Sequence, residues 1–256
     1  MAYIQWEKPF FVDLATGDIV PAGTEEAVPL PTYGNYGGGG YSAGAFGGEP
    51  LTTPSGEPLT QDELTQLGAS QAPRDALDYR FYLHDIASND VGEPYDAEQA
   101  EADAALVEEL IDLDARYDPE ASLYAGGATL GMIGRLALND QLDALSLPLL
   151  VAATEDAVGD VRYGLENLPQ QELVSALGLL FEPTAEEGVF AFDFDVTTTS
   201  LDEEIVEYLA LNALNDAVDS GETDDVPLDT GLPFSGTSDY RLTFNVATRD
   251  LDFVSV

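Results

Sequence analysis

The sequence predicts a mainly α fold that carries an α+β extension at its C-terminal end. Capping residues precede several apolar runs with a period of three to four, which predicts a series of helices. Strict alternation of apolar and polar residues at 190–196 predicts a strand of the extension. Of the 256 residues, 45% are hydrophobic, so the chain can build a sizeable core.

The N-terminal part of the chain contains few helical signals. Alternating apolar positions in residues 1–31, around 15–18, predict a short hairpin or an extended arm. Glycine dominates residues 33–48, where interleaved aromatic residues favour a packed loop, with a flexible linker as the alternative. A polar, proline-bearing stretch follows at 49–72, and within it a capping box predicts a short helix at 61–67.

The helix that follows Asp96 has the clearest pattern. Asp96 and Gln99 form a capping box, and the helix is expected to continue to residue 117. Asp103 lies on the same face as the apolar Leu106 and Val107, so its carboxylate is aimed at the core and needs a partner there. The only histidine, His84, belongs to the preceding helix and is the only imidazole that could serve. The further helices are expected at 73–87, 127–138, 141–157, 169–181 and 201–219.

Two more strands are expected at 240–246 and 251–256, on either side of a turn. The chain has no internal repeat. We divide it into an N-terminal arm or hairpin (1–32), a central domain (33–144) and an acidic α+β extension of unknown role (145–256).

Composition restricts the partners and the metals. Forty-nine acidic residues against eight Lys and Arg give a formal net charge of −41, which makes nucleic acid an unexpected partner. The chain contains no cysteine and a single histidine, so any metal should have oxygen ligands. No apolar run approaches the roughly 20 residues of a membrane span, so no transmembrane segment is expected.

The charge also bears on localisation. Self-repulsion of this size requires salt or bound cations, which a saline, calcium-rich exterior would supply. The first residues lack the basic start and apolar stretch of a cleaved signal, so we expect secretion by a route without one. The cytoplasm of a halophile is the alternative.

His84 is followed directly by Asp85, and the pair comes after the glycine-rich run Tyr33–Gly40. A histidine can take up a proton near neutral pH, and an adjacent carboxylate can hold a hard cation. The pair therefore indicates metal-assisted hydrolysis. A helix histidine satisfied by a neighbour is the alternative interpretation.

These motifs resemble the calcium-dependent phospholipase A2 family, in particular its cysteine-free members such as the parvoviral capsid phospholipase domain. The family's loop pattern Tyr-Gly-x-Tyr-x-Gly-x-Gly is matched at 33–40, and its His-Asp pair at 84–85. Pro73 and Asp78 match a proline and an aspartate that precede the histidine in the viral members. The Pro-Tyr pair that precedes the next helix of the family is matched by Pro94-Tyr95, and the Ala-Asp pair of that helix by Ala102-Asp103. The resemblance covers residues 33–138.

The resemblance implies a phospholipase A2-like core with two antiparallel catalytic helices and a glycine-rich calcium loop. It implies hydrolysis of the sn-2 ester of a phospholipid, which the charge of the chain predicts to be zwitterionic. His84 would be the general base and Asp103 would orient it, while the Gly38 N–H would assist the oxyanion. Calcium would be held by the Asp85 carboxylate and by the carbonyls of Tyr36, Gly38 and Gly40.

The chain departs from the family in two places. Ser88 stands where the family has a tyrosine that supports the catalytic aspartate, so a serine, a water or another tyrosine must hold Asp103. The insert at about 43–72 must loop out for the site to assemble, and it could form a lid. A non-catalytic calcium-binding structural or interaction protein therefore remains the alternative function.

Overall fold

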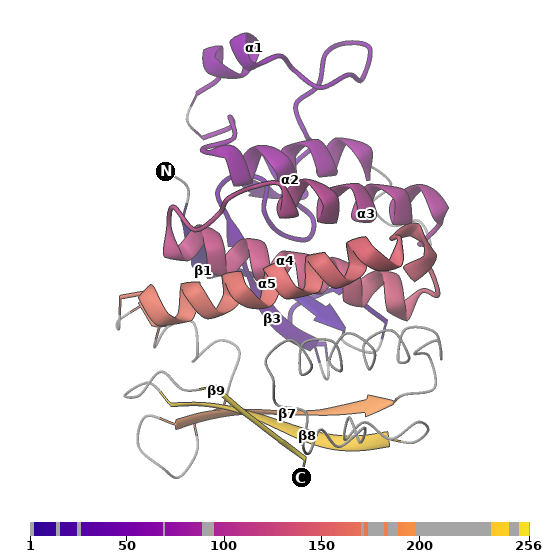
Figure 1. Cartoon of the computed structure of the whole chain (residues 1–256). Helices are drawn as coiled ribbons and strands as arrows, with labels where there is room; N and C mark the ends of the chain where they lie inside the picture. The colour runs from indigo at the N-terminus through magenta and orange to yellow at the C-terminus, as the bar shows by residue number, and fades with distance from the viewer. Residues whose placement is uncertain are drawn as a thin grey trace, which may run out of the picture.

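The computed structural model describes residues 3–13, 16–24, 27–68, 70–88, 95–169, 172–173, 182–183, 189–197, 237–245 and 251–255. These residues form an α+β structure, so the prediction of a mainly α fold with a phospholipase A2-like core is wrong (Figure 1). The N-terminal arm is a three-stranded antiparallel sheet in the order β2-β1-β3, built from Ile4–Asp13 (β1), Ile19–Val20 (β2) and Ala27–Tyr33 (β3). Pro29 and Pro31 are unusual inside a strand, so the sequence pattern indicated a hairpin or an arm here and not a three-stranded sheet.

Five α-helices are described, namely Gln61–Gln66 (α1), Ala76–Ala87 (α2), Ala97–Ile111 (α3), Pro119–Leu138 (α4) and Leu147–Asn167 (α5). A 3-10 helix, Leu142–Ala144 (η1), joins α4 to α5. The capping boxes predicted the starts of α1 and α3 correctly, because Thr60 and Asp96 both accept backbone N–H groups of their helices.

Helix α4 starts earlier than the sequence pattern predicted. Asp118 caps it and Pro119 occupies its first turn, a favoured position for proline. At Gly126 a side chain would collide with the carbonyl of Ala157 on α5, so glycine permits the two helices to pack closely.

The helices pack around two apolar clusters. One joins β1 and the glycine-rich loop to α1, α2, α3 and α4, and its members include Tyr36, Leu77 and Leu106. The other lies between α3, α4, η1 and α5 around Val107 and Leu136. Figure 1 shows the insert with α1 at the top of the molecule, above α2. None of the described helices is long and apolar enough to cross a membrane.

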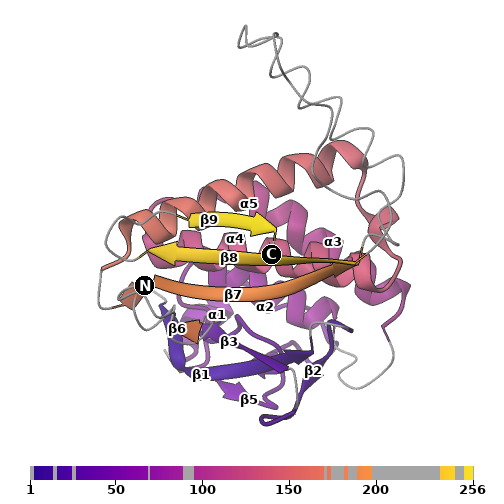
Figure 2. The same ribbon diagram turned by 90° about the horizontal axis from the view of Figure 1, so that it is seen from below.

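The C-terminal strands form a separate antiparallel sheet in the order β6-β7-β8-β9 (Figure 2). They are Glu182–Pro183 (β6), Val189–Thr197 (β7), Thr237–Asn245 (β8) and Leu251–Ser255 (β9), which confirms the three strands that the sequence predicted. The expected helix at 201–219 lies outside the described residues, as does most of the one at 169–181.

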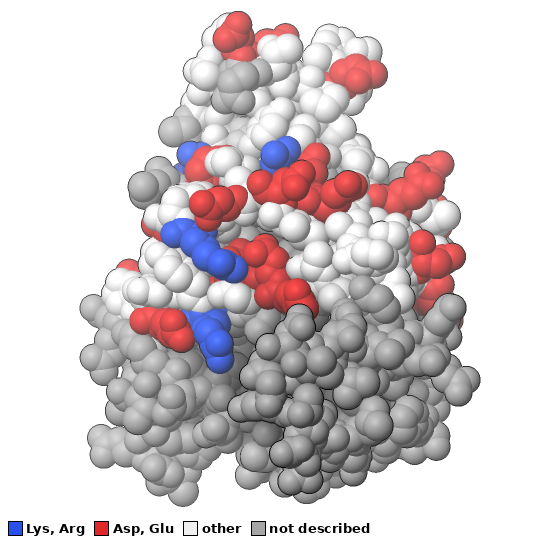
Figure 3. Space-filling model, viewed as in Figure 1, with Lys and Arg blue, Asp and Glu red and all other residues white. Residues whose placement is uncertain are grey.

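Some of the few basic side chains link one helix to another. Figure 3 shows carboxylates scattered over the described part of one face, with few Lys and Arg side chains among them. Arg80 on α2 pairs with Glu109 on α3, and Arg116 links the α3–α4 connection to Asp160 on α5 with Nε 2.7 Å from Oδ1. These two arginines therefore neutralise carboxylates where helices meet, whereas Arg162 pairs only with Glu166 on its own helix.

Candidate functional site

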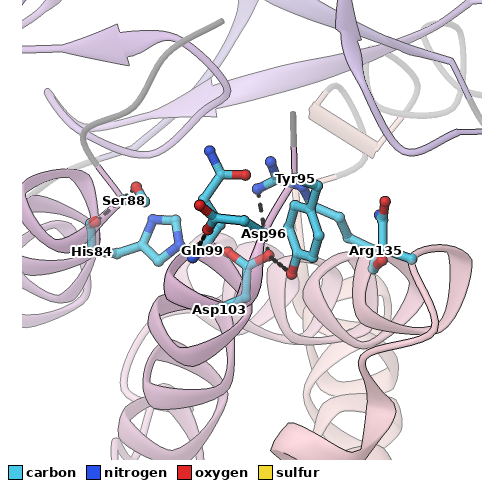
Figure 4. A network of polar contacts seen from close by, with 8 residues as sticks. His84, Ser88, Tyr95, Asp96, Gln99, Asp103 and Arg135 are labelled. Atoms are coloured by element: carbon cyan, nitrogen blue, oxygen red, sulfur yellow. Dashed lines mark hydrogen bonds and ion pairs between the residues drawn. The ribbon is translucent and has the colours of Figure 1, made fainter. Parts of the chain in front are cut away.

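The centre of the candidate site is a contact between α2 and α3 (Figure 4). His84 lies in the last turn of α2, and its Nε2 is 2.8 Å from Oδ1 of Asp103. The Asp103 side chain is fully buried, whereas the imidazole retains 11% exposure. The structure thus brings together His84 and Asp103, which the sequence had suggested as partners because Asp103 lies on an apolar helix face and His84 is the only histidine.

Two residues hold the other oxygen of the Asp103 carboxylate. The Tyr95 hydroxyl donates to Oδ2 at 2.7 Å, and Nη1 of Arg135 on α4 lies 3.4 Å from the same atom. The Arg135 guanidinium also lies 4.5 Å from the centre of the Tyr95 ring, within cation–π range. Burial and the hydrogen bond to Asp103 both raise the pKa of the Tyr95 hydroxyl, which keeps it a donor.

Ser88 does not replace the family tyrosine. Its hydroxyl donates to the backbone carbonyl of His84 at 2.8 Å and so closes the end of α2. The hydroxyl that donates to Asp103 belongs instead to Tyr95.

The contacts of Asp103 fix the state of the imidazole. An ionised carboxylate only accepts hydrogen bonds, so a neutral His84 must carry its proton on Nε2. Nδ1 then presents a lone pair, and it makes no hydrogen bond to any described residue. This arrangement can act as a general base toward a water molecule.

Asp78 on α2 holds the start of the glycine-rich loop. Its buried carboxylate accepts the backbone N–H groups of Asn35, Tyr36 and Arg74 at 2.8–3.0 Å. Burial raises its pKa to about 6, although these hydrogen bonds lower it. At Gly34, where φ is +56°, a Cβ would overlap the Asp78 carboxylate, so this position requires glycine.

The N-terminal sheet supports the rest of the loop. At Gly38, a Cβ would lie only 2.7 Å from Cγ2 of Thr32 on β3, so the loop is pressed against the sheet. The Gly38 N–H has no acceptor among the described residues. The carbonyls of Gly38 and Gly40 accept backbone hydrogen bonds from Tyr41 and Gly47, which leaves each oxygen one further lone pair.

The Asp85 carboxylate lies one residue beyond His84 and is partly buried. Within the described part of the chain its one hydrogen bond comes from the Ser42 hydroxyl, and no Lys or Arg pairs with it. Burial raises the pKa of Asp85 well above its ordinary value, the Ser42 hydrogen bond lowers it, and the Asp78 charge raises it further. A bound cation would stabilise the ionised form of this carboxylate, which burial disfavours.

The donor set suits a hard cation such as calcium. Calcium binds about 6–8 oxygens, which include carboxylates, backbone carbonyls and water. No three His, Asp or Glu side chains of the described residues converge as a metal site. The resemblance implies a single carboxylate, Asp85, with backbone carbonyls for the rest, so its ligand set would not form such a cluster.

The insert is attached to the site through tyrosines. The Tyr82 hydroxyl on α2 accepts the N–H of Leu59 and donates to the carbonyl of Leu51, each at 2.7 Å. The Tyr36 hydroxyl donates to the carbonyl of Gln71, also at 2.7 Å. The insert thus loops out at the top of the molecule while both of its halves remain fixed to the loop and to α2.

Reasoning from the sequence missed Arg135 and Ser42 and assigned no role to Tyr95. The Pro94-Tyr95 motif was a signal for the tyrosine, but Arg135 reaches Asp103 only through helix packing. No family model, no curated protein and no solved structure matches this chain.

Proposed function

We propose that this protein is a calcium-dependent hydrolase of the sn-2 ester of glycerophospholipids. The contact between His84 Nε2 and the fully buried Asp103 carboxylate carries the proposal. A buried carboxylate is costly unless it has partners, and Asp103 has a histidine, a tyrosine and an arginine. A buried carboxylate with several hydrogen-bond partners is typical of a site that orients an imidazole for proton transfer.

His84 takes a proton from water through Nδ1, and the water oxygen attacks the ester carbonyl. Asp103 stabilises the imidazolium that forms, while Tyr95 and Arg135 keep its carboxylate in place. The imidazolium then returns the proton to the leaving alkoxide, which yields a lysophospholipid and a free fatty acid. No covalent intermediate with the protein is formed.

Calcium, when bound, supplies the positive charge that polarises the ester carbonyl and stabilises the oxyanion. Asp85 and the carbonyls of Tyr36, Gly38 and Gly40 would hold it. The partly buried Asp85 carboxylate without a basic partner supports this assignment. The Gly38 N–H, which has no described acceptor, would donate to the oxyanion.

The substrate class follows from the charge of the chain. A net charge of −41 opposes binding to anionic lipid surfaces. Zwitterionic phospholipids in micelles or dispersed form avoid this repulsion. We therefore expect phosphatidylcholine to be hydrolysed in preference to anionic phospholipids.

The test is fatty-acid release from mixed phosphatidylcholine micelles, in calcium or in chelator. Wild type is compared with His84→Gln and with Asp112→Asn, a control that removes an exposed carboxylate at the end of the same helix as Asp103. Release should require calcium and fall by about 10²–10⁴-fold in His84→Gln, the usual contribution of a general base. Asp112→Asn should match wild type.

Release that persists in His84→Gln would contradict the mechanism. Absence of release from wild type, together with one calcium site that is lost in Asp85→Asn, would instead make the protein a calcium-binding module without catalysis. Absence of both would refute the whole proposal.

A further inference from the structure

The aspartates of the helix core differ in how their charge is compensated. Asp103 and Asp160 each pair with an arginine, and Asp78 accepts backbone N–H groups from three residues. Asp85 has only the hydroxyl of Ser42 among the described residues. That hydroxyl is therefore the one side-chain group that holds the carboxylate to which the proposed function assigns a cation.

Ser42 lies in a β-hairpin that directly follows the glycine-rich loop. Its strands are Tyr41–Ser42 (β4) and Ala45–Phe46 (β5), joined by the two-residue turn Ala43–Gly44. Both turn residues have positive φ, +50° and +82°, as in the tight turns typical of β-hairpins. Such a φ is strained for alanine, so the surrounding contacts must enforce this turn.

Three backbone hydrogen bonds fasten the hairpin to the loop. The Gly44 N–H donates to the carbonyl of Asn35 at 2.9 Å, that of Tyr41 to Gly38 at 3.1 Å, and that of Gly47 to Gly40 at 2.8 Å. Ser42 is buried, with 5% of the residue exposed. The hydroxyl thus has a fixed position relative to both the loop carbonyls and α2.

We propose that Ser42 is an outer-shell residue of a calcium site at Asp85. Its hydroxyl donates its single proton to Oδ2 and fixes the rotamer of the carboxylate, while Oδ1, which has no described partner, is left for the cation. Outer-shell groups that orient a ligand usually contribute a 10–100-fold gain in metal affinity. The inference rests on the calcium site of the proposed function, but not on catalysis.

The experiment is calcium titration calorimetry on the full chain after treatment with chelator. It is run in 1 M NaCl, where the Debye length of about 3 Å suppresses diffuse binding of calcium to the many surface carboxylates. Wild type should bind one calcium ion, and Ser42→Ala should bind it at least 10-fold more weakly. Ser122→Ala is the matched control, because this buried serine also makes one hydrogen bond, to the carbonyl of Asp160. Its calcium affinity should equal that of wild type.

Two further variants keep the outcomes distinct. Ser42→Cys keeps the shape of the side chain with a much weaker donor, so it should also lose affinity if Ser42→Ala fails to fold. Wild-type affinity in Ser42→Ala or Ser42→Cys, with binding lost in Asp85→Asn, would overturn the role of Ser42 and leave the calcium site intact. A wild type without a stoichiometric site would overturn both.

Discussion

Replacement of Arg135 by methionine should destabilise the protein by about 3 kcal/mol, because it leaves the Asp103 carboxylate without a cation. Loss of one partner from a buried ion pair typically costs about 3–5 kcal/mol. We expect a cost at the lower end of this range, because the Arg135 side chain is 26% exposed and its Nη1 lies as far as 3.4 Å from Oδ2 of Asp103. Asp103 also keeps its hydrogen bonds to Tyr95 and His84 in the variant. Methionine retains most of the apolar stem, so the change reports mainly on the charge.

The assay is equilibrium unfolding in urea, because guanidinium chloride would screen the charges of so acidic a chain. Arg162→Met is the control: Arg162 is 80% exposed and lies 3.9 Å from Glu166, so its loss should cost less than about 0.5 kcal/mol. In the background of Asp103→Asn the cost of Arg135→Met should shrink by about 2 kcal/mol, as expected for residues in direct contact. Equal costs in both backgrounds would refute the idea that Arg135 compensates the Asp103 charge.

Three further predictions concern stability and are measured by the same unfolding assay. Gly34→Ala should lower the free energy of unfolding by about 2–3 kcal/mol, because the added Cβ would clash with Asp78. Gly127→Ala, with open space around it in α4, should raise it by about 0.5–1 kcal/mol. Equal effects of the two variants would contradict this. Asp140→Gly should stabilise by about 1 kcal/mol, because Asp140 follows the end of α4 with φ +54° and its charge opposes the helix dipole; a loss of stability would contradict it. The pKa of Asp78 rises from 3.8 to about 6 on folding, so the folded state binds the proton of this carboxyl more tightly than the unfolded state does. The stability gained from that proton is complete below pH 3.8 and is lost as pH rises through 6. Wild type should therefore lose stability relative to Asp78→Asn over that range. A constant difference would contradict this assignment.

Local signals predicted much of the secondary structure. Thr60 and Asp96 cap their helices as the capping boxes indicated, and the alternating residues of β7 form a strand. The fold class was wrong because β1 pairs with β3 across a connection that the sequence pattern does not reveal. The register of that pair also shifts between Gln5 and Phe10, which interrupts the alternation expected of a strand.

The candidate site was predictable where one residue had a single possible partner. Asp103 on an apolar helix face required a polar partner, and His84 was the only imidazole in the chain. Arg135 could not be assigned in this way, because it is 32 residues from Asp103 and meets it only where α4 packs on α3. Ser42 required knowledge of the hairpin turn, which depends on an alanine in a conformation that sequence propensity disfavours.

The placement of charge links these observations. With eight basic residues for 49 acidic ones, the chain can provide a cationic partner for only a few of its carboxylates. Among the described residues, the buried aspartates that form ion pairs are Asp103 and Asp160, and their arginines also join helices, whereas Asp78 relies on backbone N–H groups. Asp85 receives neither an arginine nor a backbone donor among the described residues, although it adjoins His84. A carboxylate left in this state is unfavourable for folding alone, and this supports the proposal that a cation from solution completes the site.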